Sequence, residues 1–265
     1  MAGAQWDPSR YERFSGHRSR PFADLLARVG ADEPRLVVDL GCGTGTMTMR
    51  AASRWPTARV VGIDSSPTML QRARELDSAG RVQWMQADIA DWDVRSAGEP
   101  DVVLSNAALQ WVPGHRELIS RWCRQLRDGS WFALQVPGNF DAPSHRSVAE
   151  AAAAHPRHAQ LVPLLPVDPV GQPADYAELL ADGCQHVDVW ETTYLQILDP
   201  AGESADPVLD WLRGTTLLPL LAVLDDADRR AFLDDLSGRL VRAYPRRRYG
   251  VPFAFRRIFA VGQRG

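Results

Sequence analysis

The chain has 265 residues, of which 45% are hydrophobic and 24% charged, and its formal net charge at pH 7 is −3. The apolar fraction is sufficient for one sizeable core. The slightly negative charge excludes a strong general attraction to nucleic acid or to anionic membranes. No signal-peptide pattern opens the sequence, and no apolar run is long enough to cross a bilayer. We therefore expect a cytoplasmic protein.

The cysteines and the missing lysines exclude several kinds of chemistry. Cys42, Cys123 and Cys184 are odd in number and far apart, with no metal-ligand spacing, so neither a disulfide nor a metal site is expected. Every basic side chain is arginine or histidine, because the chain contains no lysine. A Schiff-base lysine and a phosphate-loop lysine are therefore excluded.

The N-terminal segment, residues 1–30, is rich in aromatic side chains and arginine. Pro21 is predicted to open an amphipathic helix that runs through Val29, because proline is well placed at a first helical position. The preceding residues, Trp6 to Arg20, either pack on the sheet as a solvated lead-in or fold over a ligand cleft as a lid.

A glycine-rich turn follows the first predicted strand, Leu36 to Leu40. Alternating glycines in Gly41-Cys42-Gly43-Thr44-Gly45 match the first βα turn of nucleotide-binding α/β sheets, where the backbone approaches a ligand closely. The dinucleotide fingerprint needs another small residue where Thr46 stands. Asp39 at the strand end would also repel a pyrophosphate. A ligand with an ammonium group and no phosphates, such as S-adenosylmethionine, fits better.

Strands and helices alternate over residues 31–138, which predicts a Rossmann-like, doubly wound, parallel α/β sheet. Ligands of such sheets bind beyond the carboxyl ends of the strands. Polar residues close four of the strands, so we expect their side chains to meet in one crevice. They are Asp39, Asp64, Asp88 and Asn106. The later strands are expected at 59–64, 82–87, 101–106 and 131–136, with helices over 46–54, from 67 and over about 115–126.

Residues 139–183 interrupt this alternation. Helical patterns near 147–154 and 176–180 flank a stretch punctuated by prolines. We predict a helical lid inserted over the mouth of the cleft, without a core of its own. In residues 184–265 we expect a strand over 187–197, helices over 207–212 and 226–244, and a last strand over 253–261. The prediction is one domain, 1–265, with its cofactor-binding core over 31–138.

Residues Val37 to Gly45 resemble the first motif of the class I S-adenosylmethionine-dependent methyltransferases. The resemblance implies a seven-stranded sheet, mostly parallel with one antiparallel C-terminal strand. It also implies that Asp64 holds the ribose hydroxyls, that Asp88 and Ile89 hold the adenine, and that Asp39 helps to hold the ammonium of the methionine tail. The full set of expected cofactor residues is Asp39, Gly41, Cys42, Gly43, Asp64, Ser65, Met69, Asp88, Ile89, Asn106, Ala107 and Trp111.

Segments outside this motif, spread over nearly the whole chain, resemble the trans-aconitate 2-methyltransferases. They include Trp6-Asp7-Pro8, Arg18-Ser19-Arg20-Pro21, Asn106-Ala107-Ala108-Leu109-Gln110-Trp111, Pro143-Ser144-His145 and Thr192-Thr193-Tyr194. The likeness implies that a carboxylate of trans-aconitate, or of a closely related polycarboxylate, becomes a methyl ester. S-Adenosylmethionine is then the methyl donor and S-adenosylhomocysteine the product.

A polycarboxylate acceptor requires fixed cations, and the planar guanidinium group suits carboxylates best. The candidate substrate-binding residues are Arg18, Arg20, Gln135, Asn139, His145, Tyr194, Trp211 and Arg257. Any of these arginines could instead form a surface ion pair of little energetic value. Because a carboxylate is already ionised at neutral pH, the reaction depends on positioning and on exclusion of water, and no general base is proposed.

Other functions remain open on the same scaffold. A natural-product methyltransferase with a hydroxyl acceptor would need a base, for which His17 or His145 is the candidate. A non-catalytic S-adenosylmethionine-binding protein is a further alternative. Nucleic-acid methylation is disfavoured, because Asn106-Ala107-Ala108-Leu109 lacks an aromatic residue that could stack on a flipped base. We expect a monomer or weak homodimer whose partner is a small molecule.

Overall fold

The structure is a computed structural model. It describes residues 15–167, 169–214 and 216–265, with side chains from Ser19 onward. None of the described helices combines the length and the apolar composition that a membrane crossing requires.

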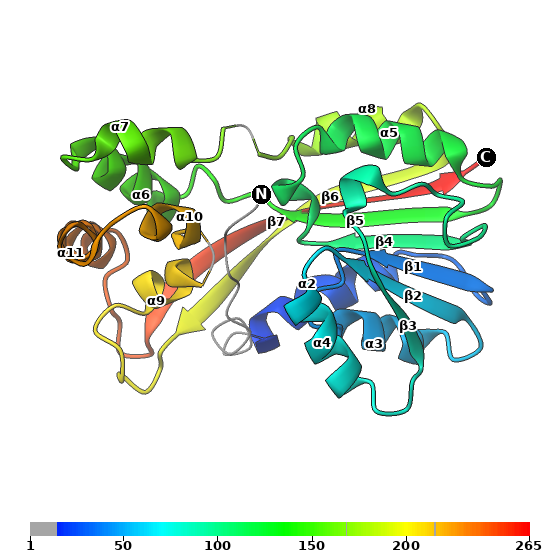
Figure 1. The fold of residues 1–265 in the computed structure, drawn as a ribbon, viewed down its shortest axis with the longest axis horizontal. Coiled ribbons are helices and arrows are strands. Elements are labelled where there is room, and N and C mark those ends of the chain that lie inside the picture. The colour runs from blue at the N-terminus through cyan, green and yellow to red at the C-terminus, as the bar shows by residue number, and fades with distance from the viewer. Residues whose placement is uncertain (1–14, 168, 215) are drawn as a thin grey trace. The chain divides into compact units, whose positions relative to one another are not determined.

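The described residues form a seven-stranded sheet in the order β3-β2-β1-β4-β5-β7-β6 (Figure 1). The strands β1 to β5 pair in parallel, and β7 runs antiparallel to β5. This confirms the expected fold class. The strands are β1 (Leu36–Leu40), β2 (Arg59–Asp64), β3 (Val82–Gln86), β4 (Val102–Asn106), β5 (Trp131–Pro137), β6 (Cys184–Leu198) and β7 (Val251–Arg264).

The helices that follow these strands begin where the sequence places caps and turns. Ser66 caps α4 by accepting a hydrogen bond from the Met69 backbone N–H at 3.3 Å. The helices are α2 (Ser15–Ala27), α3 (Thr46–Arg54), α4 (Pro67–Leu76), α5 (His115–Gln125), α6 (Pro143–Ala154), α7 (His158–Leu161), α8 (Pro173–Ala181), α9 (Pro207–Arg213), α10 (Leu218–Ala222) and α11 (Asp226–Ala243), with short 3₁₀ turns η1 (Ile89–Asp91), η2 (Leu109–Trp111) and η3 (Val162–Leu164).

The expected start of the first helix at Pro21 is wrong. Helix α2 already begins at Ser15 and carries Pro21 in its interior. A proline removes one backbone hydrogen bond from a helix without preventing the helix from continuing beyond it. Pro21 is therefore a poor marker of this boundary.

Contacts divide the chain into two compact units, which we describe separately. The sheet unit consists of residues 16–137, 169–192 and 257–265. Its core is built from the β-branched and leucine residues of the strands, and Val37, Val38 and Leu104 are fully buried. Helix α8 belongs to this unit and packs against α5.

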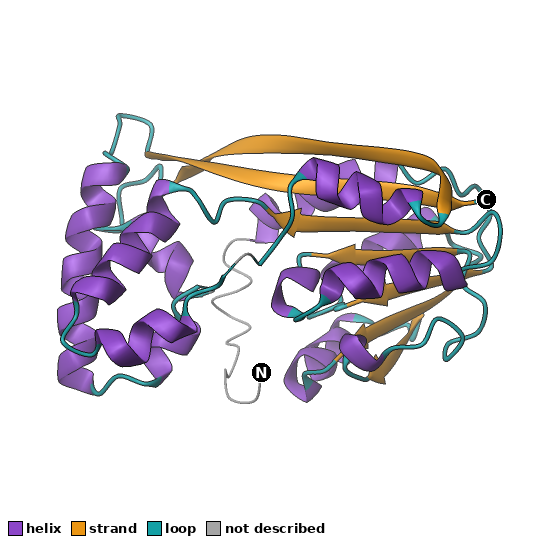
Figure 2. Cartoon of the chain, turned by 90° about the horizontal axis from the view of Figure 1, so that it is seen from above, coloured by secondary structure: helices purple, strands orange, loops and turns teal. Residues whose placement is uncertain are grey.

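The helical unit contains residues 138–168 and 193–256, with α6, α7, α9, α10 and α11 (Figure 2). Helices α6 and α7, from the stretch expected to have no core of its own, contribute to a core that they share with later parts of the chain. Val148, Ala152 and Leu161 join one hydrophobic cluster with residues between Leu198 and Phe255. The apolar face of α6 is completed by residues far along the chain, which a local sequence pattern does not reveal. The lid role of this stretch stays a prediction.

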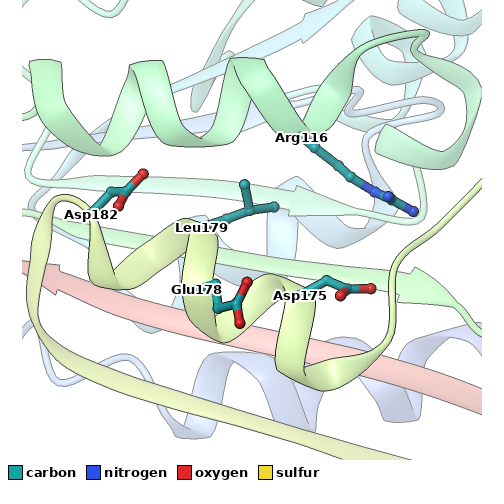
Figure 3. A pocket seen from close by; sticks show the side chains of 5 residues that line it. All are labelled: Arg116, Asp175, Glu178, Leu179 and Asp182. Carbon is teal, nitrogen blue, oxygen red and sulfur yellow. The ribbon is translucent and has the colours of Figure 1, made fainter.

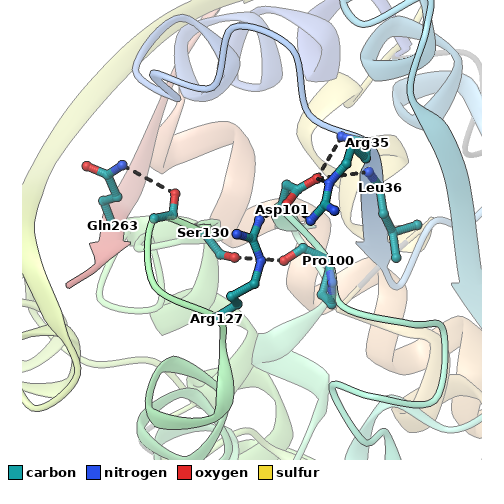
Figure 4. A network of polar contacts seen from close by, with 8 residues as sticks. Arg35, Leu36, Pro100, Asp101, Arg127, Ser130 and Gln263 are labelled. Carbon is teal, nitrogen blue, oxygen red and sulfur yellow. Dashed lines mark hydrogen bonds and ion pairs between the residues drawn. The ribbon is translucent and has the colours of Figure 1, made fainter.

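A buried carboxylate holds the amino-terminal ends of the strands together (Figure 4). Asp101, just before β4, accepts hydrogen bonds from the backbone N–H of Arg35 at 2.7 Å and of Leu36 at 3.3 Å. The guanidinium groups of Arg35 and Arg127 also donate to it. Burial raises the pKa of Asp101, but these donors outweigh burial and lower that pKa to about 2. The network lies at the end of the strands opposite to the predicted cofactor crevice.

Candidate active site

The glycine turn between β1 and α3 adopts a backbone that only glycine takes easily. Gly41, Gly43 and Gly45 have φ angles of 77°, 55° and 79°. A Cβ atom on Gly41 would lie 2.2 Å from the Cβ of Ala108, whereas one on Gly43 would meet nothing within 4 Å. Gly41 is therefore needed for close packing against the segment after β4, and the backbone at Gly43 borders open space.

The backbone donors of this turn are already used within the chain. The N–H groups of Gly41 and Cys42 both donate to the Ile63 carbonyl, at 2.8 and 2.9 Å. The Gly43 N–H donates to Asp64 at 2.8 Å. Phosphate-binding turns instead direct their N–H groups at the ligand. This turn therefore does not offer these donors to a phosphate, and any contact of Gly41 or Gly43 with a methionine tail would use the carbonyl oxygens.

Asp39 places an incompletely satisfied carboxylate at the end of β1. Its side chain is 1% exposed, and its Oδ2 atom accepts a hydrogen bond from the Thr48 hydroxyl at 2.6 Å. Its Oδ1 atom has no hydrogen-bond partner among the described residues. Burial raises the pKa of Asp39 to about 6, opposed by the bond from Thr48 and reinforced by the charge of Asp64. A buried, partnerless acceptor of this kind suits an ammonium group.

Asp64 links the glycine turn to the start of α4. Its Oδ2 atom accepts from the Gly43 N–H and its Oδ1 atom from the Ser66 N–H, each at 2.8 Å. Each carboxylate oxygen keeps a second lone pair, so the predicted bonds from ribose hydroxyls remain compatible with these contacts. Burial raises the pKa of Asp64, and the two backbone bonds oppose that rise. Neighbouring Ser65 is exposed, and Met69 is buried on α4.

The predicted adenine residues lie just after β3. Asp88 is exposed and caps η1 by accepting from the Ala90 N–H at 2.9 Å. Ile89 is buried, with its Cδ1 atom 3.9 Å from the position that a Cβ on Gly41 would occupy. Ile89 thus lies beside the glycine turn, as a side chain on the face of a bound ring requires.

A strained residue follows the end of β4. Ala107 has a φ angle of 56°, which costs roughly 1–2 kcal/mol for a residue with a Cβ. Its N–H donates to the Gln135 carbonyl at 2.8 Å, and its carbonyl accepts from the Gln110 side chain at 2.7 Å. These bonds hold the strained turn in place. The Oδ1 atom of Asn106, one residue earlier, is buried without a partner in the described part of the chain. Trp111 in η2 is 36% exposed.

Two predicted acceptor residues meet in the sheet unit. Arg257 on β7 donates from Nη1 to Oε1 of Gln135 on β5 at 3.3 Å, and both side chains are almost fully buried. The Nε2 atom of Gln135 has no partner among the described residues. Gln135 is also the register partner of Asn106. Arg20 is exposed on α2, and the side chain of Arg18 lies outside the described residues.

The other predicted acceptor residues belong to the helical unit. Nδ1 of His145 lies 3.5 Å from the Asn139 amide nitrogen, and its Nε2 atom lies 3.4 Å from the Thr216 hydroxyl. Burial lowers the pKa of His145 to about 4, with the charge of Asp141 opposing. His145 is therefore neutral near pH 7. Asn139 is buried, and its Oδ1 atom has no partner in the described part of the chain.

Tyr194 and Trp211 are also buried in the helical unit, at 5% and 3% exposure. The Trp211 ring packs against Phe253 and Phe255, with centroids 5.7 and 5.6 Å away. This packing assigns Trp211 to the hydrophobic core. A direct contact of Trp211 with an acceptor stays a prediction that the geometry does not favour.

Comparison with known proteins identifies the family. A family model described as a methyltransferase domain matches residues 37–129. A trans-aconitate 2-methyltransferase of Rhodococcus jostii is 51% identical over 263 residues, covering 97% of this chain and 99% of the relative. A protein of the same name from Streptomyces coelicolor is 48% identical over 98% of this chain and 86% of its own length. The chain belongs to the trans-aconitate 2-methyltransferase family.

Solved structures share the fold at low sequence identity. Phosphoethanolamine N-methyltransferase 2 of Haemonchus contortus, solved with phosphomonomethylethanolamine and S-adenosylhomocysteine, is 17% identical with a TM-score of 0.54. The alignment covers 93% of this chain and 53% of that one. The YcgJ protein of Bacillus subtilis gives a TM-score of 0.55 at 11% identity, over 93% of this chain and 98% of its own. These likenesses confirm the α/β methyltransferase fold.

Two residues of the candidate active site are not predicted by the sequence. Thr48 on α3 binds Asp39, and Gln110 in η2 binds the strained Ala107. Gln110 lies in the segment Asn106 to Trp111, which follows β4. A polar side chain among apolar neighbours there could have indicated a structural hydrogen bond. Thr48 lies nine residues after Asp39, on the helix that the glycine turn opens, and such a pairing requires knowledge of how the turn folds.

The structure also contains a pocket of about 330 Å³ between α5 and α8, and no predicted site residue lines it (Figure 3). Its lining residues are Arg116, Asp175, Glu178, Leu179 and Asp182. Asp175 and Glu178 on α8 and Asp182 just after its end are exposed carboxylates, so solvation accounts for them and we assign no function to this pocket.

Proposed function

We propose that this protein transfers the methyl group of S-adenosylmethionine to a carboxylate of trans-aconitate, or of a closely related polycarboxylate, and so forms a methyl ester. The observation that carries the proposal is the full-length similarity to trans-aconitate 2-methyltransferases at about half identity, which extends through both units. The chemistry of the strand-end residues in the sheet unit supports the choice of methyl donor.

The donor residues fit S-adenosylmethionine, which supplies an electrophilic methyl group on a sulfonium. The partnerless Oδ1 atom of Asp39 would accept a hydrogen bond from the ammonium of the methionine tail. The carboxylate of Asp64 would accept from the ribose hydroxyls, since ionised carboxylates are acceptors only. The glycine turn uses its own N–H groups internally, which argues against a phosphate-bearing cofactor.

The acceptor requires cations that hold the carboxylates which do not react. Arg257 is the candidate within the sheet unit, because it is buried and already orients toward a neutral amide, Gln135. Arg20 is the second candidate, on α2. The reacting carboxylate should not be tightly paired with an arginine, since a bound cation would reduce its nucleophilicity.

The transfer needs no general base, because a carboxylate acceptor is ionised near pH 7. Of the two histidines named as possible bases, His17 has a side chain outside the described residues, and His145 has a pKa of about 4. A base with so low a pKa would be weak at neutral pH. His145 is therefore better suited to a neutral hydrogen-bond role, and this favours a carboxylate over a hydroxyl as acceptor.

The direct test offers the purified protein methyl-labelled S-adenosylmethionine and a panel of acids: trans-aconitate, cis-aconitate, citrate and tricarballylate. We expect transfer to trans-aconitate, with label that is released by mild base because the product is an ester. An absence of transfer to every acid, while the cofactor still binds, would contradict the proposed acceptor. Label that resists base would indicate methylation of another kind of atom.

We also propose that the protein works in the cytoplasm as a monomer or weak homodimer, without nucleic-acid or membrane partners. The slight net negative charge supports this, since a basic surface is the usual requirement for binding nucleic acid or anionic lipid. Light scattering during gel filtration would test the oligomeric state, and a stable mass of four chains or more would contradict it.

A further inference from the structure

A single hydroxyl group connects the strand before the glycine turn to the helix after it. Thr48 lies in the first turn of α3 and its side chain is fully buried. Its hydroxyl donates to the Oδ2 atom of Asp39 at 2.6 Å, a length typical of a strong bond to a charged acceptor. Asp39 and Thr48 thus close the glycine turn from its two ends.

Because of this bond, the two carboxylate oxygens of Asp39 have different surroundings. A hydroxyl has one proton to donate, and Thr48 gives it to Oδ2. The Oδ1 atom is buried and has no partner among the described residues. Leaving a buried carboxylate oxygen without a donor is costly unless a ligand supplies one. The site therefore holds one oxygen in place and keeps the other available.

We propose that Thr48 is a positioning residue for the methyl donor: its hydroxyl orients the Asp39 carboxylate and reserves Oδ1 for the ammonium group of the methionine tail. This inference rests on the proposed function, because it requires S-adenosylmethionine or its product in the cleft. Neither sequence reasoning nor family membership assigns a role to Thr48.

The charged surroundings of Asp39 explain why such a residue is needed. Burial disfavours the ionised form, and the negative charge of Asp64 on β2 disfavours it further. Cys42 in the glycine turn stays neutral, because burial and the two carboxylates raise the pKa of its thiol well above its usual value. On β4 the register partner of Asp39 is Leu104, which carries no charge. Among these neighbours, the hydrogen bond from Thr48 is the interaction that favours the ionised carboxylate.

The test compares Thr48→Val, which keeps the shape and removes the donor, with Thr48→Ser, which keeps the donor. Two ligands are titrated by calorimetry between pH 5 and pH 7.5: S-adenosylhomocysteine, and 5′-methylthioadenosine, which lacks the amino-acid tail. Up to about pH 7 an α-amino group stays mostly protonated, so a loss of affinity below that pH does not come from the ligand. Any pH dependence common to both ligands belongs to the ribose contact at Asp64. A pH dependence of the affinity that is found only with S-adenosylhomocysteine is assigned to Asp39.

For the unchanged protein we expect the affinity for S-adenosylhomocysteine to fall roughly tenfold from pH 7 to pH 5, as Asp39 takes up a proton with a pKa of about 6. In Thr48→Val this midpoint should move up by about one pH unit or more, since a hydrogen bond to a charged group is lost. The affinity at pH 7 should then drop about twofold for a shift of one unit and about tenfold for a shift of two. Binding of 5′-methylthioadenosine should not change, and Thr48→Ser should restore the original midpoint.

Several results would overturn the inference. An unshifted midpoint in Thr48→Val, with normal binding by the unchanged protein, would remove the role of Thr48 and leave the proposed function intact. Equal weakening of both ligands would indicate a displaced α3, a purely structural effect. Failure of the unchanged protein to bind S-adenosylhomocysteine at all would reject both proposals. If Thr48→Val does not fold, Thr48→Ala provides the same test. The quantity compared is then the ratio of its affinities for S-adenosylhomocysteine and 5′-methylthioadenosine.

Discussion

Arg257 is the side chain that we propose to bind the acceptor in the sheet unit. Replacing it with glutamine removes a cation while keeping a polar group beside Gln135. We expect the KM for trans-aconitate to rise between about tenfold and a hundredfold, because a charge-assisted hydrogen bond contributes roughly 1.5–3 kcal/mol. The dissociation constant of S-adenosylhomocysteine should stay unchanged. Steady-state kinetics and calorimetry on the same preparation measure both quantities.

The adjacent arginine offers a matched control. Arg256 is half-buried and donates to the Gly138 carbonyl at 3.2 Å. Arg256→Gln should therefore leave the KM for trans-aconitate within about twofold of its original value, since no acceptor contact is lost. Equal effects of the two substitutions would mean that Arg257 acts through the stability of β7 and not through the acceptor.

For single residues, the sequence predicts the type and position of the strand-end carboxylates, because their spacing follows from the alternation of strands and helices. It does not predict their partners. The Gln135–Arg257 bond joins residues 122 positions apart, and the free oxygen of Asp39 depends on which atom Thr48 binds. Such contacts arise from the folded packing of the turn and of antiparallel β7, and no local pattern encodes them.

Among the secondary-structure elements, the glycine turn makes a prediction about stability. Gly41→Ala should destabilise the protein by more than about 2 kcal/mol, since it combines a positive φ with a Cβ 2.2 Å from Ala108. Gly129→Ala is the control, because its φ of 83° is similar and a Cβ there would meet nothing within 4 Å. Urea unfolding should give a larger loss for Gly41. Similar losses would show that the close approach to Ala108 has no energetic consequence.

The Asp101 network predicts how stability depends on acidity. Since the folded-state pKa of Asp101 is lowered to about 2, its contribution is present above its unfolded pKa of about 3.9. The contribution is lost as the pH falls toward 2. We expect it to be about 2 kcal/mol at most, because the Arg35 and Arg127 side chains are 71% and 45% exposed and solvent screens them.

Asp101→Asn should therefore lower the free energy of unfolding at pH 6 and flatten its decline between about pH 4 and pH 2. Asp128→Asn is the control, because Asp128 is 80% exposed and its ion pair with Arg264 is 3.7 Å long. Urea titrations across this pH range would measure both variants. An unchanged decline in Asp101→Asn would assign the acid sensitivity to other carboxylates.

Element boundaries were predictable where one physical signal dominates. The five parallel strands are short runs rich in apolar residues between turn residues, and their predicted limits agree with the structure to within a residue. The predicted start of the first helix at Pro21 is wrong, because Pro21 lies inside α2 and does not mark its beginning. The packing of residues 139–183 is not predictable from a local pattern, because α6 completes its apolar face with Phe232 and Leu236 of α11, far along the chain. A short-range pattern cannot distinguish a lid from one part of a shared core.

For the whole molecule, assembly of the sheet depends strongly on strand β7. In the sheet order, β7 stands between β5 and β6 and is hydrogen-bonded to both. Deleting residues 257–265 should therefore leave a chain without cooperative unfolding, because β5 and β6 both lose a neighbour. Deleting Gly265 alone is the control and should change little. Calorimetry would compare the two, and a cooperative transition in the longer deletion would contradict this importance of β7.

The position of β7 also has a consequence for synthesis on the ribosome. Folding during translation generally proceeds from the N-terminus, yet here β6 cannot join the sheet until β7 has been synthesised. The nascent chain must therefore carry β6, with its unpaired backbone groups, until β7 has left the exit tunnel. An unpaired strand edge is prone to association with other chains. We therefore expect the incomplete chain, and not the finished protein, to be the form that most needs a chaperone.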